Sequence, residues 1–186
     1  MSGSFDSSII IYNKDTYQPD LIIKKHSGNI CCIIQLNSGE LVSCSYDKTI
    51  KIYNIKGVQY ELLQTLNYHK SYVYKILELK NKALVSCSDD SSIIFYLKDN
   101  KEYKKNYQIS TNGPCSSIIQ TKDKEICYSE NNNSAICFYD ILERKIKSTI
   151  SNISKYNRLR EWIIMMKKVL LLIPGENQLS IINTNE

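Results

Sequence analysis

The sequence predicts an all-β protein in which one antiparallel sheet is repeated along the chain. The first reason is a segment that recurs at nearly constant spacing. Its five copies are DSSIIIYN from Asp6, DKTIKIYN from Asp47, DSSIIFYL from Asp90, NSAICFYD from Asn133 and ENQLSIIN from Glu176. The seventh residue of each copy is Tyr12, Tyr53, Tyr96, Tyr139 and Ile182, which gives spacings of 41, 43, 43 and 43 residues. A period of this length indicates an array of similar structural units.

The second reason is that other residue types repeat in the same register. His26 lies 21 residues before Asp47, and Ser43 lies four residues before it. The same three residue types recur 43 positions later, from His69 to Asp90. The repeated unit therefore includes more than the segment around each tyrosine.

The third reason is that each period reads as four short strands. Residues 30–36, 40–45, 49–53 and 60–66 are rich in Ile, Val, Tyr and Cys, and turn-forming residues separate them. A single sheet of this size cannot bury both of its faces, whereas sheets stacked around an axis bury them against one another. We therefore expect the sheets to pack face to face around a common axis.

The period, together with the pattern His-x20-Asp-x5-Tyr, resembles the WD40 repeat, whose signature runs from Gly-His to Trp-Asp. The resemblance covers essentially the whole chain. At the Trp-Asp position this sequence has Tyr-Asn, Tyr-Asn, Tyr-Leu, Tyr-Asp and Ile-Asn. The resemblance implies a β-propeller with about four visible blades, as an incomplete, open ring or a fragment of a seven-bladed propeller.

The resemblance also gives the expected limits of the blades within a single propeller region, residues 1–186. We expect the last two strands of one blade at 5–25, whole blades at 27–68, 69–111 and 112–154, and three strands of a final blade at 155–186. Three explanations for the partial ring stay open: a fragment of a longer protein, completion by a second copy or a partner, and closure as a small ring. An open arc leaves sheet faces and edges exposed, so self-association is expected. Closure by one 186-residue chain would leave an apolar segment stranded, Ile9-Ile10-Ile11, and this favours the open arc.

In the WD40 family a His, a Ser or Thr, an Asp and a Trp form a hydrogen-bonded relay within each blade, and the resemblance implies two such sets here. They are His26, Ser43, Asp47 and Tyr53, then His69, Ser86, Asp90 and Tyr96, with Tyr in place of Trp. The pattern fades in the next set, Asn112, Ser129, Asn133 and Tyr139, and in the last, Lys155, Leu172, Glu176 and Ile182. The relay is expected to stabilise each blade when all of its polar groups are satisfied.

Assignment of both histidines to the relay leaves none for general-base or metal chemistry, so we expect no enzyme, cofactor or metal site. A nucleophilic pair of Cys44 and His26 is the catalytic alternative.

The seven cysteines include no Cys-x-x-Cys pair, and Cys31 and Cys32 are expected to point to opposite faces of a strand. Reduced thiols and the absence of a signal peptide favour the cytoplasm, with the nucleus as an alternative. The most apolar stretch, residues 162–173, is too short to span a bilayer.

Partner contacts in this family cluster on the narrow face of the propeller, and the resemblance gives candidate positions for them. We expect other proteins or peptides as partners, and no small-molecule substrate or membrane. The alternative is RNA or a ribonucleoprotein bound through a basic surface, although the net charge of +5 comes from scattered residues. The candidate contact residues are Phe5, Asn29, Tyr46, Tyr72, Tyr74, Asp89, Arg158 and Arg160.

Overall fold

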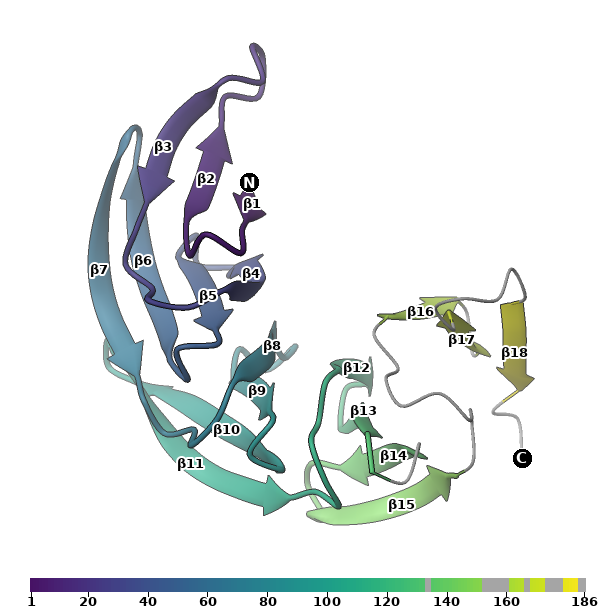
Figure 1. Cartoon of the computed structure of the whole chain (residues 1–186). Helices are drawn as coiled ribbons and strands as arrows, with labels where there is room; N and C mark the ends of the chain where they lie inside the picture. Colours follow the sequence, from purple (N-terminus) through teal and green to yellow (C-terminus); the bar gives the residue numbers. More distant parts are fainter. Residues whose placement is uncertain (133–134, 152–160, 166–167, 173–178, 184–186) are drawn as a thin grey trace.

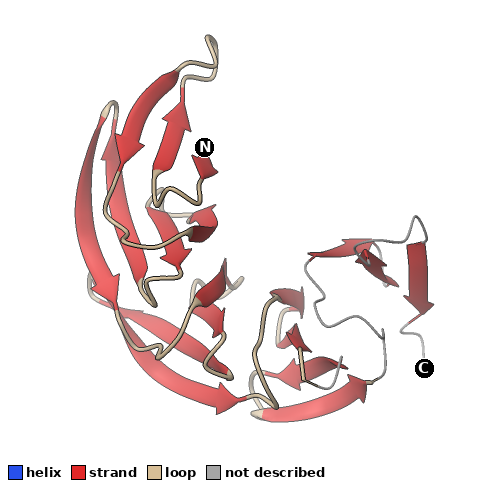
Figure 2. Ribbon diagram, in the orientation of Figure 1, coloured by secondary structure: helices blue, strands red, loops and turns tan. Residues whose placement is uncertain are grey.

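The computed structural model describes residues 1–132, 135–151, 161–165, 168–172 and 179–183. Every regular element in these residues is a β-strand, and the strands form five antiparallel sheets (Figure 2). None of the described residues belongs to a helix that is long and apolar enough to cross a membrane. The predicted all-β class is therefore confirmed.

The first two sheets contain three and four strands. The first has the order β1 (Ser2–Gly3), β2 (Ile9–Tyr12) and β3 (Pro19–Ile23). The second has the order β4 (Ile30–Gln35), β5 (Leu41–Ser45), β6 (Ile50–Lys56) and β7 (Gln59–Leu66).

The next two sheets repeat the four-stranded order of the second. The third sheet contains β8 (Val73–Glu78), β9 (Leu84–Ser88), β10 (Ser92–Asp99) and β11 (Glu102–Ser110). The fourth contains β12 (Ile118–Lys122), β13 (Glu125–Glu130), β14 (Ala135–Asp140) and β15 (Lys145–Ile150). The fifth contains β16 (Glu161–Met165), β17 (Lys168–Leu172) and β18 (Leu179–Asn183).

The sheets follow one another along an arc whose two ends do not meet (Figure 1). The strands β4, β8 and β12 lie on the concave side of the arc, and β7, β11 and β15 lie on the convex side. The described sheets thus form an open propeller, as the sequence predicts.

The middle strands explain why the sheets stack. The strands β5 and β9 have the same sequence, LVSCS, and all ten of their residues are buried, five in each strand. Side chains alternate between the two faces of a strand. Accordingly, Leu41 packs toward the first sheet, whereas Val42 and Cys44 pack toward the third. A strand buried in this way needs a neighbouring sheet on each side.

The recurring tyrosine occupies an equivalent place in successive sheets. The pairing of the third and outer strands shifts register immediately before Tyr53, Tyr96 and Tyr139. The same shift precedes Tyr12 where β2 pairs with β3. A β-bulge at one position in four sheets shows that the repeated segment adopts one conformation. In the fifth sheet, Ile182 pairs with Val169 on β17.

The amino-terminal part forms the first sheet, and its apolar segment packs on the second sheet. A short strand, β1, precedes the two strands expected at 5–25 and pairs with β2 through Ser2 and Gly3. In addition, Ile9 is 1% exposed, and Ile11 packs against the same apolar cluster. In the open arc this segment is buried, because one face of the first sheet packs on Ile30, Leu41 and Tyr53 of the second.

This packing predicts that Ile9→Ala destabilises the protein by about 2–4 kcal/mol, because it leaves a cavity between the first two sheets. The matched control is Ile22→Ala on the neighbouring strand, since Ile22 is 50% exposed. It is expected to change the free energy of unfolding by less than about 1 kcal/mol. Denaturant melts measure both values, and equal losses would contradict the observed packing.

Candidate functional site

The second sheet contains a buried hydrogen-bonded set formed by His26, Asp47 and Ser43. Nδ1 of His26 lies 2.6 Å from Oδ2 of Asp47, and Nε2 lies 2.8 Å from Oγ of Ser43. With the carboxylate as acceptor, Nδ1 carries the proton, and Nε2 accepts from the serine hydroxyl. Asp47 also accepts from the backbone N–H groups of Ser27 and Thr49 at 3.1 and 3.0 Å. The aspartate thus joins the loop before β4 to the turn before β6.

The third sheet repeats this arrangement and extends it by one residue. His69 bonds to Asp90 at 2.9 Å and to Ser86 at 2.7 Å. The Tyr96 hydroxyl lies 3.1 Å from Oγ of Ser86. Since the serine hydroxyl donates to the histidine, the tyrosine donates to the serine. The predicted four-residue relay is complete in this sheet.

The relay of the second sheet ends at Ser43. The buried hydroxyl of Tyr53 forms no hydrogen bond of normal length and angle among the described residues, although Ser43 is near enough to act on its pKa. The Tyr53 ring instead makes an edge contact with Tyr60, at 6.2 Å between centroids, and packs against the first sheet. Burial raises the pKa of Tyr53 to about 12. The same residue type at the same register position therefore has a different hydrogen-bonding role.

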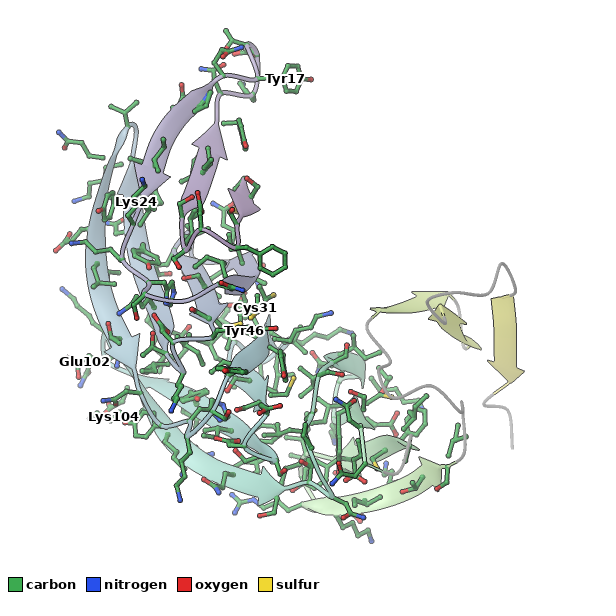
Figure 3. The ribbon with its side chains drawn as sticks, viewed as in Figure 1. Tyr17, Lys24, Cys31, Tyr46, Glu102 and Lys104 are labelled. Carbon is green, nitrogen blue, oxygen red and sulfur yellow. The ribbon has the colours of Figure 1, made fainter. Side chains whose placement is uncertain are left out.

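Three tyrosines meet where the second and third sheets adjoin on the face that carries the relay aspartates. The Tyr46 and Tyr72 rings are stacked, with centroids 4.4 Å apart and planes at 16°. The Tyr74 ring makes an edge contact with Tyr46 at 6.0 Å, and its hydroxyl donates to Oδ1 of Asp89 at 2.9 Å. We call Tyr46, Tyr72, Tyr74 and Asp89 the aromatic cluster. Figure 3 shows Tyr46 toward the concave side of the arc.

Backbone hydrogen bonds fix these side chains in place. The N–H of Tyr46 donates to the carbonyl of Asn29 at 3.0 Å, and the N–H of Asp89 donates to the carbonyl of Tyr72 at 2.9 Å. Asn29 and Tyr72 are 43 residues apart, as are Tyr46 and Asp89, so each bond is the repeat of the other. Gly28 permits the close approach in the second sheet, because a Cβ there would lie 2.7 Å from the Asp47 nitrogen.

Comparisons with known proteins identify the repeat. Residues 18–54 match the family model described as "WD domain, G-beta repeat". This segment includes His26, Ser43, Asp47 and Tyr53. The chain carries a WD40 repeat. None of the curated proteins compared with it matches the sequence.

A solved structure shares the fold of this chain over nearly its whole length. The chain aligns with a chain of "Crystal Structure of Mitotic Checkpoint Complex" with a TM-score of 0.79, 16% sequence identity and coverage of 96%. It spans 55% of the length of that solved chain. At this identity the match shows the fold alone.

The fourth sheet replaces the WD40 relay with a different set of bonds. Ser129 accepts from the N–H groups of Ser116 and Ser117 at 3.2 and 3.0 Å. The N–H of Asn112 donates to Oε1 of Glu130 at 3.0 Å. Glu130 lies 43 residues after Cys87, so a carboxylate replaces a thiol at this position of the repeat. This replacement is the feature of the sequence that could have indicated the different set of bonds. Asn133 lies outside the described residues, and Tyr139 is buried.

The other predicted residues are placed as follows. Phe5, between β1 and β2, is 81% exposed, and Asn29 is half-buried. Leu172 lies on β17 and Ile182 on β18. Arg158, Arg160, Lys155 and Glu176 lie outside the described residues.

Both ring nitrogens of each histidine are engaged in the relays. His26 is bonded to Ser43 and Asp47, so the alternative pairing with Cys44 is not formed. Within the described ranges, no group of three His, Cys, Asp or Glu side chains could hold a metal ion. The geometry of both sets is that of a structural relay.

The relay aspartates predict a pH dependence of stability. Burial acts to raise the pKa of Asp47 and Asp90, but several hydrogen bonds together outweigh it and hold both pKa values well below the usual range. Asp47 accepts from His26 and Thr49, and Asp90 accepts from His69, Ser92 and the Lys70 N–H. A depressed folded-state pKa stabilises the protein above the unfolded pKa of about 4, and the stabilisation is lost as the pH falls below it. In denaturant melts at pH values above and below about 4, the Asp47→Asn and Asp90→Asn variants are expected to show a weaker pH dependence of the free energy of unfolding than the unaltered chain. Asp15→Asn, in the exposed turn after β2, is the control, and an equal change there would contradict the assignment.

The two relays also predict opposite effects of one substitution. Tyr96→Phe is expected to destabilise the protein by about 1 kcal/mol, because it removes the hydrogen bond to Ser86. Tyr53→Phe removes a buried hydroxyl without a partner and is expected to be neutral or stabilising. Thermal and denaturant melts of this matched pair test the difference, and a larger loss at Tyr53 would show that its hydroxyl is bonded in solution.

Proposed function

We propose that this WD40 chain is a non-catalytic protein-interaction module whose partner contacts the aromatic cluster. The observation that carries the proposal is the stack of Tyr46 on Tyr72 across the boundary between two blades, with Tyr72 41% exposed. The four residues come from two repeats, so the surface exists only when neighbouring blades are packed.

The chemistry of the aromatic cluster is suited to protein recognition. Tyrosine is enriched at binding hot spots because its ring covers a large apolar area and its hydroxyl forms directional bonds. Here the rings are held before binding by the stack and by the bond from Tyr74 to Asp89. Side chains that are already ordered lose less conformational entropy when a partner binds.

The fold and the relay support the same proposal. WD40 propellers are generally protein-interaction scaffolds, and the similar solved chain belongs to a structure described as a complex. The histidines of the repeat are used within the blades. A cytoplasmic or nuclear location is part of the proposal and agrees with the free state of the described cysteines.

The alternative, RNA binding through a basic surface, receives less support. Several described lysines are paired with carboxylates, including Lys98 with Glu40 at 2.6 Å and Lys147 with Asp140 at 2.9 Å. The aromatic cluster contains a carboxylate, which would repel phosphate. Arg158 and Arg160 are retained as predicted contacts on the same face.

The proposal predicts that Tyr72→Ala weakens binding of the partner captured by the full chain from its source cells by about tenfold or more. Tyr17→Ala is the matched control: Tyr17 is 79% exposed but lies at the tip of the hairpin between β2 and β3 (Figure 3). Binding of the purified partner to each variant, measured by calorimetry, gives the dissociation constants.

Two results would contradict the proposal. One is equal affinity of the Tyr72→Ala and Tyr17→Ala variants, which would place the contact elsewhere. The other is a captured nucleic acid whose affinity falls steeply with salt, which would favour the RNA alternative.

A further inference from the structure

Two cysteines lie directly opposite each other within the second sheet. Cys32 on β4 and Cys44 on β5 are register partners in an antiparallel pair. Such partners have Cα atoms about 4.5–5.5 Å apart, which falls inside the range of about 4.4–6.8 Å that a disulfide requires. Their side chains also lie on the same face of the sheet, because opposed residues share a face.

The packing confirms that the two thiols share this face. Cys44 belongs to the apolar cluster between the second and third sheets, and Cys32 packs against that cluster. Sγ of Cys32 lies 3.8 Å from the carbonyl oxygen of Ile76 on β8. Cys31 is the extra residue of a bulge between Ile30 and Cys32, and it too packs against the cluster. The alternation expected for Cys31 and Cys32 does not apply, because the bulge interrupts the regular strand.

The two thiols differ in exposure. Cys44 is 0% exposed, whereas Cys32 is partly exposed. Cys32 also lines a hollow of about 200 Å³ together with Met1, Ser2 and Gly3. Solvent therefore reaches part of Cys32 while the blades stay packed, but it does not reach Cys44.

The two thiols also differ in acidity. A hydrogen bond from the Cys44 thiol outweighs the effect of burial and, with the nearby Lys75, lowers the pKa of Cys32 to about 6. Burial raises the pKa of Cys44 well above its usual value. It also raises the pKa of the neighbouring Cys31 to about 12. Because the thiolate is the nucleophile, Cys32 is the reactive member of the three.

We propose that Cys32 and Cys44 are a peroxide-reactive pair that forms a reversible disulfide within one blade. The Cys32 thiolate attacks one peroxide oxygen, the O–O bond breaks, and hydroxide leaves while Cys32 becomes a sulfenic acid. The Cys44 sulfur then attacks the Cys32 sulfur, the S–O bond breaks, and water is released. In total two thiols are oxidised to one disulfide, and one hydrogen peroxide is reduced to two waters.

The repeat provides an internal comparison. In the third sheet, Cys87 occupies the place of Cys44, but its register partner is Lys75. In the fourth sheet the equivalent position is Glu130. Among the three described four-stranded sheets, only the second therefore has two opposed thiols. Cys87 instead neighbours the buried Cys115, a thiol of the segment between β11 and β12.

The experiment treats the full reduced chain with hydrogen peroxide, blocks the remaining thiols under denaturing conditions and maps disulfides by mass spectrometry. We expect one main product, Cys32–Cys44, which a small dithiol reverses. Cys31→Ser is the matched control and is expected to form the same disulfide. In Cys44→Ser, we expect no intramolecular disulfide and capture of a sulfenic acid at Cys32 by dimedone.

A second measurement decides the matter if Cys44→Ser does not fold. In the folded unaltered chain at about pH 7, iodoacetamide is expected to modify Cys32 more than about tenfold faster than Cys31. The proposal is overturned if the main disulfide is Cys87–Cys115 or involves Cys31, if none forms, or if Cys31 and Cys32 are alkylated at equal rates.

Discussion

Contact between neighbouring sheets is the interaction on which the rest of this molecule depends. Each described four-stranded sheet has buried middle strands, and one apolar cluster lies between each successive pair of the first four sheets. The aromatic cluster therefore reports on blade packing, since Tyr46 and Tyr72 belong to different sheets.

Polar groups in this fold are satisfied by different means from blade to blade. In the third sheet, Tyr96 completes a chain of bonds through Ser86 and His69 to Asp90. In the second sheet the chain ends at Ser43, and in the fourth Ser129 bonds the backbone before β12. Where the relay fades, aromatic contacts join the blades. The Phe95 ring of the third sheet lies 6.3 Å, between centroids, from the Tyr139 ring of the fourth, and the Arg144 guanidinium lies 4.4 Å from the Tyr107 ring centroid.

The period of the sequence predicted which residues would be equivalent, and therefore the fold class, because one backbone conformation recurs in each repeat. The resemblance to the WD40 repeat implied both His–Ser–Asp sets and gave Tyr46, Tyr72 and Tyr74 as candidate contacts on one face. The free hydroxyl of Tyr53 could not be predicted, since it depends on which side chains of the adjacent sheet surround the ring. The contact of Cys31 and Cys32 with one cluster required a bulge that the residue pattern does not reveal.

The identity of β5 and β9 has a consequence for how the chain finds its native pairing. Both strands read LVSCS, so their side chains give β4 little basis for choosing between them. The turn that connects β4 to β5 therefore decides which of the two strands pairs with β4. The hairpin after β4 closes within five residues, with bonds from Leu36 N–H to Glu40 and from Gly39 N–H to Leu36, and Gly39 adopts a φ of 96°. Closing so short a loop costs less entropy than reaching β9, more than 40 residues further along. A tight turn thus protects a repetitive chain from exchanging identical strands during folding, a failure characteristic of repeat proteins.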